Sequence, residues 1–159
     1  MKQLWAPWRR DYILGPKVQG CIFCKALEED PREALVLSSG AFAFVMLNRY
    51  PYINGHLLIS PRRHVAHIEE LEEPESAQLM ARIRQCVRIF KEVYRPDGFN
   101  LGMNLGKVAG AGVEEHLHFH LLPRWNGDTN FMSVVGETRV ISELLSTTWD
   151  TLVPFFAEK

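Results

Sequence analysis

The sequence contains no apolar run long enough to cross a membrane, and its first residues lack the hydrophobic stretch of a secretory signal peptide. It also lacks an excess of charge, because 18 Lys and Arg against 19 Asp and Glu give a formal net charge of −1. A near-neutral chain gives no sign of general nucleic-acid affinity, although the local pair Arg62-Arg63 could meet phosphate. We therefore expect a cytoplasmic protein that binds neither nucleic acid nor a membrane.

Cysteine is scarce, with three residues in the chain, and two of them form the segment Cys21-Ile22-Phe23-Cys24. In the reducing compartment expected here, this spacing indicates metal or redox chemistry more than a structural disulfide. A pair of reduced, half-buried thiols is the alternative. The third cysteine, Cys86, falls near the apolar face of a predicted helix, and we expect it to be structural.

Internal repeats and low-complexity tracts are absent, and 159 residues suffice for one domain with a closed core. Residues 1–20 carry large aromatics among prolines and glycines, which predicts an irregular arm that packs on this domain or on a partner subunit. A disordered arm is the alternative. We expect residues 21–159 to form a single catalytic domain. The aromatic residues of the arm are Trp5, Trp8 and Tyr12.

Hydrophobic periodicity predicts strands and two helices. The run 41–47 has no polar residue, so both of its faces should be covered. One helix begins near Pro74, and a C-terminal helix from about Val140 is ended or interrupted by Pro154. Short strands joined by turns around a long helix indicate an α+β domain with a mostly antiparallel sheet. The predicted strands are 35–37, 41–47, 56–60, 99–105 and 116–122, and the apolar stripe of the long helix is Leu79, Ile83, Val87, Phe90 and Tyr94.

The segment 115–124 carries the main chemical signal. His116, His118 and His120 alternate with apolar residues, so a β-strand would place all three imidazoles on one face. Pro123 should end this strand, because proline cannot donate to a sheet ladder. Imidazoles serve as ligands, bases and nucleophiles near neutral pH, and three in alternation indicate a functional site.

Strand 99–105 also alternates, with its apolar residues predicted to face a core. Asn100, Gly102 and Asn104 would then face either a ligand or solvent, and this strand alone does not decide between them. The glycine-rich turn 106–112 follows. Its backbone amides could cradle phosphate oxygens as an anion nest.

These residues resemble the histidine triad (HIT) family of nucleotide hydrolases and transferases. The triad motif, His-φ-His-φ-His-φ-φ with φ apolar, corresponds to residues 116–122. Asn48 with residues 55–64 resembles a second family block, and residues 104–110 resemble the phosphate loop that precedes the triad. The resemblance covers roughly residues 20–135. It implies a five-stranded antiparallel sheet with two helices, assembled as a homodimer or higher homo-oligomer.

The resemblance also implies roles for individual residues. His118 would attack the α-phosphorus to give a nucleotidyl-histidine intermediate, with its tautomer fixed by the carbonyl of His116. His120 and His56 would contact the phosphate chain. The ribose contact would be Asn48, and the contacts to the phosphates would come from Asn104 and from the loop residues Gly110, Ala111 and Gly112.

Family members that carry Cys-x-x-Cys bind zinc through this pair and two histidines. The corresponding residues here are Cys21, Cys24, His64 and His116. Two thiolates and two imidazoles form a closed tetrahedral set, which implies a structural zinc site. No motif includes His67, which we expect to be structural.

The aromatic start and the Pro123-Arg124-Trp125 continuation most resemble the bacterial diadenosine tetraphosphate phosphorylase branch. This implies a nucleotide substrate, such as diadenosine tetraphosphate, that is cleaved at the α-phosphate. Ala111 replaces a glutamine found in many members, and one extra residue precedes the triad. With Arg124 and Trp125, these departures favour phosphate over water as acceptor, unless Arg124 pairs with a surface carboxylate. The alternatives are a nucleoside phosphoramidate hydrolase and a nucleotide-binding module without turnover.

Overall fold

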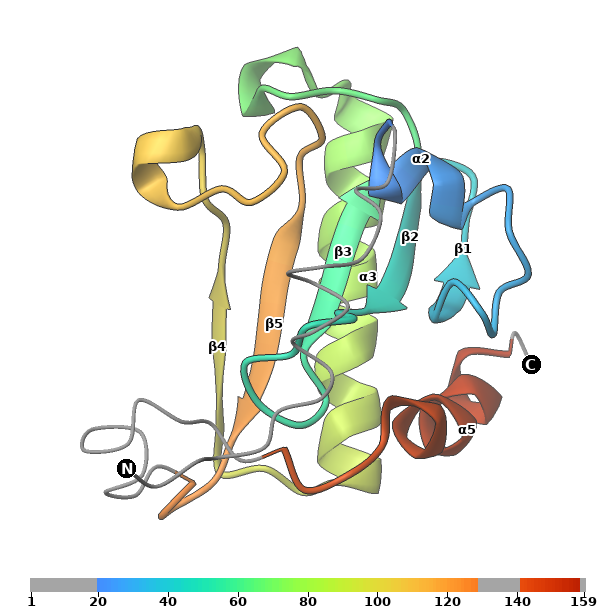
Figure 1. Ribbon diagram of the computed structural model, residues 1–159, viewed down its shortest axis with the longest axis vertical. Coiled ribbons are helices and arrows are strands. Elements are labelled where there is room, and N and C mark those ends of the chain that lie inside the picture. Colours follow the sequence, from blue (N-terminus) through green and yellow to red (C-terminus); the bar gives the residue numbers. More distant parts are fainter. Residues whose placement is uncertain (1–19, 129–140, 158–159) are drawn as a thin grey trace, which may run out of the picture.

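A five-stranded antiparallel sheet with strand order β1-β2-β3-β5-β4 forms the centre of the protein (Figure 1). The structure is a computed structural model that describes residues 20–128 and 141–157. The strands are β1 (Val36–Ser39), β2 (Ala43–Leu47), β3 (Leu57–Pro61), β4 (Gly98–Gly102) and β5 (Phe119–Arg124). The helices are α2 (Ile22–Ala26), α3 (Glu73–Val93) and α5 (Leu145–Phe156), with short 3₁₀ turns η1 (Ile68–Glu70) and η2 (Lys107–Ala109).

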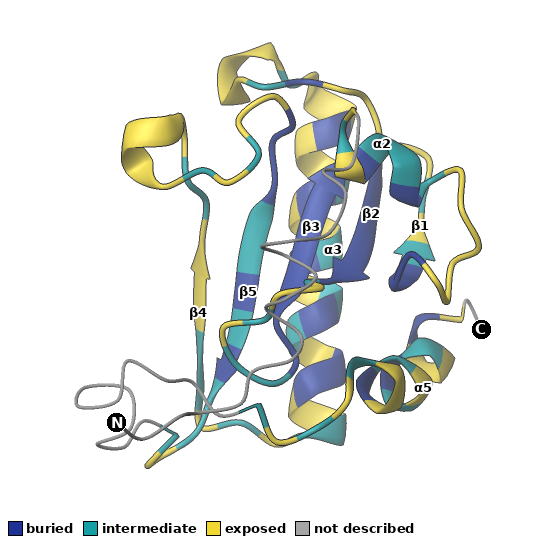
Figure 2. Cartoon of the chain, viewed as in Figure 1, coloured by how far each residue is buried: buried dark blue, intermediate teal, exposed yellow. Residues whose placement is uncertain are grey.

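The sheet separates two hydrophobic clusters. The larger one joins α3 and α5 to alternate residues of β2 and β3, including Val45, Leu47 and Ile59. The smaller one packs Phe23 and other residues near α2 against the intervening residues of the same strands. Figure 2 shows β2 and β3 buried throughout. This confirms covered faces for residues 43–47 of the apolar run 41–47, whereas Ala41 and Phe42 precede β2 and are exposed.

The long helix α3 begins where the sequence predicts, with Pro74 in its first turn. Its start is stabilised by a capping box, in which the Glu75 carboxylate accepts a hydrogen bond from the backbone N–H of Glu72 at 2.9 Å. Cys86 lies fully buried on the core side of α3, and burial raises the pKa of its thiol to about 12. This thiol is therefore a packing group, as expected from its position in the sequence.

The histidine strand differs from its prediction at both ends. β5 begins at Phe119, because the backbone before it pairs elsewhere: the Leu117 N–H donates to the carbonyl of Val65 at 2.8 Å. Pro123 does not end the strand but lies inside it, opposite Phe99 of β4. β3 pairs with β5 only as far as Leu121, so β5 has a single neighbour at Pro123.

The edge strand β4 is shorter than the predicted 99–105 and ends at Gly102. The prediction that its apolar residues face a core is wrong for Leu101 and Leu105, which are both 49% exposed. Phe99, in contrast, packs against the larger cluster. An edge strand with one open side does not need the alternation of a covered strand to be strict.

The C-terminal helix α5 starts at Leu145, and Pro154 lies within it instead of ending it. It packs on β1 and α3. The indole N–H of Trp149 donates to the carbonyl of Val36 at 3.0 Å, and Arg32 pairs with Asp150 at 2.8 Å. Among the described residues, no helix is long and apolar enough to span a membrane. The predicted arm lies almost wholly outside the described residues.

Candidate functional site

Four histidines gather on the face of the sheet that α2 covers. His120 is the register partner of Leu58, which packs in the cluster around α2. Because side chains alternate along β3, His56 lies on the same face as Leu58. The His118 ring lies 4.9 Å from that of His120, and His116 is buried beside it. The fold thus brings together the four histidines expected to be catalytic.

The tautomer of His118 is set by its own strand. Its Nδ1–H donates to the backbone carbonyl of His116 at 2.9 Å, the hydrogen bond expected from the sequence. Nε2 of His118 therefore carries a lone pair. Burial lowers the pKa of this imidazole, which keeps the ring neutral at pH 7. The ring of Phe23 lies 4.8 Å from the His118 ring and covers one side of it.

His56 and His120 form a second hydrogen-bonded unit. Nδ1 of His56 accepts from the backbone N–H of Tyr52 at 3.1 Å and from the side-chain amide of Asn48 at 3.2 Å. The proton of His56 must then be on Nε2, which donates to Nδ1 of His120 at 2.8 Å. The same reasoning places the His120 proton on Nε2. Burial, with a smaller effect from His118, lowers the pKa of His120 to about 4, so its ring is neutral.

The two units give neighbouring imidazoles opposite chemistry. His118 offers an unprotonated ring nitrogen, and His120 offers an N–H group. A nucleophile beside a proton donor is the arrangement that covalent group transfer requires. Chemically, the cluster can attack an electrophilic centre and donate a hydrogen bond to the atom that leaves.

The two cysteines and two histidines expected to bind zinc also come together. Their sulfur and nitrogen atoms all lie within 4.8 Å of one another. Cys21 Sγ lies 3.2 Å from Nδ1 of His116, and Cys24 Sγ lies 3.4 Å from Nδ1 of His64. Tetrahedral zinc, with bonds of about 2.3 Å to sulfur and about 2.0 Å to nitrogen, places such atoms about 3.6 Å apart. The donor set therefore fits a tetrahedral ion of this size.

His116 is oriented for metal binding by a second partner. Its Nε2–H donates to the carbonyl of Pro61 at 2.9 Å, so the lone pair is on Nδ1, beside the cysteines. Burial lowers the pKa of His116, which keeps that lone pair available. Burial and the Cys21 thiol raise the pKa of Cys24, so a bound metal would displace a proton from this thiol.

The predicted phosphate loop leaves and re-enters the sheet at the histidines. β4 ends at Gly102, the register partner of His120, and the chain returns to the triad at His116. Within the loop, the Asn104 side chain donates to the carbonyl of Gly110 at 3.3 Å. Gly110 has a φ of 92°, a conformation that favours glycine. Asn104, Gly110, Ala111 and Gly112 thus belong to one loop beside the triad.

Arg124 and Trp125 do not belong to this site. Arg124 pairs with Asp128 at 2.6 Å, and the indole of Trp125 donates to the carbonyl of Tyr94 at 3.3 Å. Arg124 follows His118 by six positions of extended chain, a span of roughly 20 Å. Within one chain, these two residues therefore lie away from the triad, and the support for a phosphate acceptor drawn from them in the sequence is wrong. The alternative, pairing of Arg124 with a carboxylate, is confirmed.

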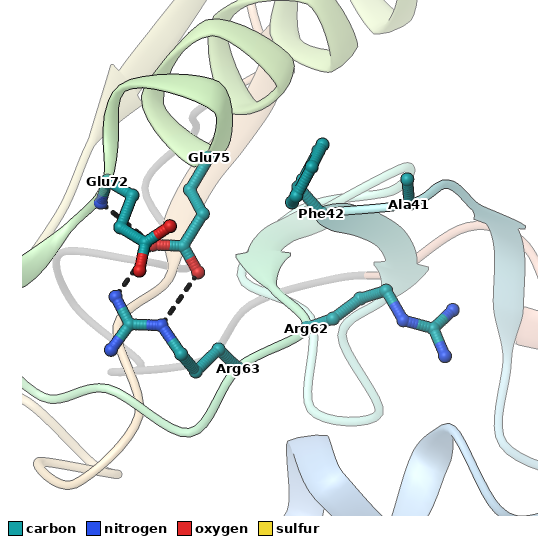
Figure 3. Close-up of a pocket in the computed structure, with 6 residues that line it drawn as sticks. All are labelled: Ala41, Phe42, Arg62, Arg63, Glu72 and Glu75. Carbon is teal, nitrogen blue, oxygen red and sulfur yellow. Dashed lines mark hydrogen bonds and ion pairs between the residues drawn. The ribbon is translucent and has the colours of Figure 1, made fainter.

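A pocket of about 290 Å³ lies at the start of α3, and its lining includes none of the histidines. Figure 3 shows Arg63 turned toward two glutamates and Arg62 turned away from them. Arg63 pairs with Glu75 at 2.7 Å, while Arg62 donates to the side chain of Ser39 and the carbonyl of Gly40. Both guanidinium groups are thus satisfied by the protein. We therefore take the histidine cluster, and not this pocket, as the candidate active site, because only the cluster offers a nucleophile beside a proton donor.

Two aromatic residues of the cluster were not identified from the sequence. Phe23 contacts the rings of His116 and His118, and Tyr52 stacks on His120 with 5.8 Å between ring centroids. Phe23 lies between the two cysteines, and Tyr52 lies inside the segment 48–56 that carries two candidate residues. Their position within segments that carry candidate site residues was the only hint in the sequence that these two aromatics lie near the site. It does not reveal which ring each aromatic contacts.

Comparison with known proteins agrees with this geometry. The model of the HIT domain matches residues 29–127. AP-4-A phosphorylase of Mycobacterium tuberculosis is 40% identical over 157 residues, covering 93% of this chain and 80% of the relative. An uncharacterised HIT-like protein of Methanocaldococcus jannaschii is 34% identical and covers 68% of this chain and 81% of its own.

Among solved structures, a hypothetical histidine triad nucleotide-binding protein of Sulfolobus tokodaii aligns with a TM-score of 0.66 at 25% identity. The alignment covers 86% of this chain and 89% of that chain. The sheet, the triad and these matches together define the class: the chain belongs to the HIT family. The family resemblance and the five-stranded antiparallel fold predicted from the sequence are confirmed, and the two predicted long helices are α3 and α5.

Proposed function

We propose that this protein is a nucleotide-processing enzyme that cleaves dinucleoside polyphosphates, such as diadenosine tetraphosphate, at the α-phosphate. The observation that carries the proposal is the hydrogen bond from His118 Nδ1–H to the carbonyl of His116, which directs the lone pair of His118 to Nε2. The likeness to AP-4-A phosphorylase supports this class of substrate.

In the first step, Nε2 of His118 attacks the α-phosphorus. A nitrogen–phosphorus bond forms, and the bond from phosphorus to the bridging oxygen breaks. The leaving group from diadenosine tetraphosphate is ATP, and the Nε2–H of His120 donates a hydrogen bond to its departing oxygen. His56 keeps that proton on Nε2 by donating to Nδ1 of His120.

In the second step, inorganic phosphate attacks the nucleotidyl-histidine. An oxygen–phosphorus bond forms, the bond to His118 breaks, and the product is ADP. With water in place of phosphate, the product would be AMP. We favour phosphorolysis because of the likeness to AP-4-A phosphorylase and the small residue Ala111 in the phosphate loop. The side chains of Arg124 and Trp125 give it no support within one chain.

The remaining expected residues hold the substrate. Asn48 lies at the end of β2, half-buried, with its side-chain nitrogen 3.2 Å from the His56 ring, and we assign it the ribose contact. We assign the phosphate contacts to Asn104 and to the loop residues from Gly110 to Gly112. The brace between Asn104 and Gly110 supports this assignment because it holds the backbone amides of the loop in one arrangement.

Zinc is the metal we assign to Cys21, Cys24, His64 and His116, since two thiolates and two imidazoles without an open position form a structural site. When bound, it would join the cysteine segment to the start of the triad. We also propose a homodimer or higher homo-oligomer, supported by the position of β4 at the edge of the sheet that the described residues form and by its exposed Leu101. Light scattering of the purified protein tests the assembly.

The function is tested by incubating the enzyme with diadenosine tetraphosphate in phosphate-free buffer and again with added phosphate. We expect ADP and ATP, formed only when phosphate is present. AMP and ATP at equal rates in both buffers would identify a hydrolase. Turnover of adenosine phosphoramidate alone, or binding by calorimetry with no product, would contradict the proposal in favour of the other two candidates.

A further inference from the structure

Glu143 joins three separate parts of the chain through one oxygen. Its Oε2 accepts hydrogen bonds from Asn54 Nδ2 at 3.2 Å, from the Tyr94 hydroxyl at 3.0 Å and from the Thr148 hydroxyl at 2.6 Å. Hydrogen bonds to a carboxylate are stronger than those between neutral groups. Glu143 precedes α5 and lies beyond the residues 29–127 that the family model matches, so the HIT domain itself does not account for this junction.

Two of the three donors are anchored in the body of the domain. Thr148 is buried in the first turn of α5, and Tyr94 follows the last residue of α3. Burial and the hydrogen bond to Glu143 raise the pKa of Tyr94 to about 12, so its hydroxyl remains a donor across the neutral range. Glu143 is thus held against α3 and α5, both of which pack on the sheet.

The third donor belongs to the loop that holds His56. Asn54 lies two residues after Tyr52, whose backbone N–H donates to Nδ1 of His56, and two residues before His56 itself. Gly55, between them, has a φ of 75°, and a Cβ there would crowd the ring of Phe90 at 3.2 Å. The loop therefore crosses α3 closely at this point, and the Asn54 side chain fixes it to Glu143.

We infer that Glu143 is a positioning residue for the candidate active site, acting through Asn54 on the loop that orients His56. The orientation of His56 matters because its Nε2–H keeps the proton of His120 on the nitrogen that would face the leaving group. Without the link, the loop no longer holds the Tyr52 N–H on Nδ1 of His56, which keeps only the Asn48 amide as donor, and the His56–His120 pair is held less firmly. The consequence for turnover rests on the proposed function, whereas the consequence for the two imidazoles does not.

The first measurement is therefore independent of substrate. In protein labelled with ¹⁵N at histidine, Glu143→Ala and Asn54→Ala should both shift the ring nitrogen signals of His56 and His120. Tyr94→Phe and Thr148→Val each remove one of the other hydrogen bonds to Glu143 and serve as matched controls. They should lower the melting temperature but leave these signals in place. Unchanged His56 and His120 signals in Glu143→Ala and Asn54→Ala would overturn the inference.

The second measurement uses turnover of diadenosine tetraphosphate. Displacement of catalytic groups by small distances costs rate, so Glu143→Ala and Asn54→Ala should each lower kcat by roughly 10-fold to 100-fold with a smaller change in KM. The double variant should lose no more than either single variant, because both break the same link. Glu143→Gln keeps an acceptor oxygen and should recover most of kcat.

Two outcomes would contradict the inference or the proposed function. Losses of kcat in the Tyr94→Phe and Thr148→Val controls equal to those in Glu143→Ala would reduce Glu143 to a stabiliser of α5. If the wild type turns over none of the proposed substrates, the proposed function fails while the imidazole signals still decide the role of Glu143.

Discussion

The phenyl ring of Phe23 lies 4.8 Å from the imidazole of His118, measured between ring centroids and with 33° between the ring planes. Phe23 stands between Cys21 and Cys24, whose sulfur atoms face His116. The segment that would bind the metal therefore also covers one side of the His118 ring, the candidate nucleophile. The metal cluster and the triad are thus one structure, joined by a ring contact and by the backbone of His116.

The candidate nucleophile gives the first prediction. His118→Ala should lower turnover of diadenosine tetraphosphate by several orders of magnitude while nucleotide binding changes little, because the covalent step needs the ring nitrogen and binding does not. Rapid-quench assays and isothermal calorimetry measure the two effects. Mass spectrometry of the wild type during turnover should also detect one added nucleotidyl group, which His118→Ala lacks. A variant that keeps most of the wild-type rate would contradict the covalent mechanism.

The proposed metal cluster gives the second prediction. Protein purified without added metal should contain one zinc per chain, and Cys24→Ser should lose it. A chelator should lower the melting temperature of the wild type, since the free energy of metal binding is part of the folding free energy. Cys86→Ala is the matched control, because this third cysteine is buried on the core side of α3 and its loss should leave the zinc content unchanged. Metal-free wild type that melts identically with and without chelator would exclude the site.

The sequence predicted the histidine cluster well because alternation along a strand is a local property. Strand 116–122 was nevertheless misplaced, since Leu117 bonds to Val65, a partner that only the tertiary structure supplies. The predicted burial of Leu101 was wrong for a related reason. Periodicity distinguishes the two faces of a strand, but it does not distinguish an edge strand from a central one.

Apart from the hydrogen bond from His118 to the carbonyl of His116, the hydrogen-bond network around the triad could not be predicted. Tyr52 holds His56 through a backbone N–H, and every residue except proline has one, so the identity of Tyr52 carries no signal for this contact. Likewise, the contacts of Glu143 with Tyr94 and Asn54 join residues 49 and 89 positions apart, which no local pattern reveals. Local patterns placed the reacting groups, and the carbonyl of His116 sets the tautomer of His118, whereas contacts outside this strand set those of His56 and His120.

The ion pair of Arg63 with Glu75 gives a pH-dependent prediction. Arg63 holds the pKa of Glu75 below its ordinary value, so the pair stabilises the folded state above the pKa of the unfolded carboxyl and is lost as pH falls through the folded value. Arg63→Gln should therefore melt below the wild type at pH 7, with a difference that narrows below about pH 4.5. Thermal melts across this range measure it. Arg62→Gln should show no such trend, since Arg62 pairs with no carboxylate among the described residues.

Loss of metal at low pH does not affect the difference in melting temperature between wild type and Arg63→Gln. Wild type and Arg63→Gln carry the same cysteines and histidines, so loss of metal at low pH lowers both melting curves and cancels in their difference. A constant difference from pH 7 to acid would show that Glu75 titrates alike in the folded and unfolded states, and the ion pair would then contribute nothing.

Gly55 gives the last prediction, because backbone conformation and space both oppose a side chain there. Its φ of 75° costs an L-residue about 1–2 kcal/mol, and a Cβ would lie 3.2 Å from Phe90 and 3.3 Å from Pro123. Gly55→Ala should destabilise the fold by at least this amount in denaturant titrations. It should also lower kcat, since the strained residue lies between Asn54 and His56.

Gly98→Ala is the control, because a Cβ at Gly98 meets nothing within 4 Å and its φ is not positive. Equal stability of the two variants would mean that the loop tolerates displacement at Gly55. A stable Gly55→Ala with normal kcat would further show that the orientation of His56 does not depend on this crossing of α3.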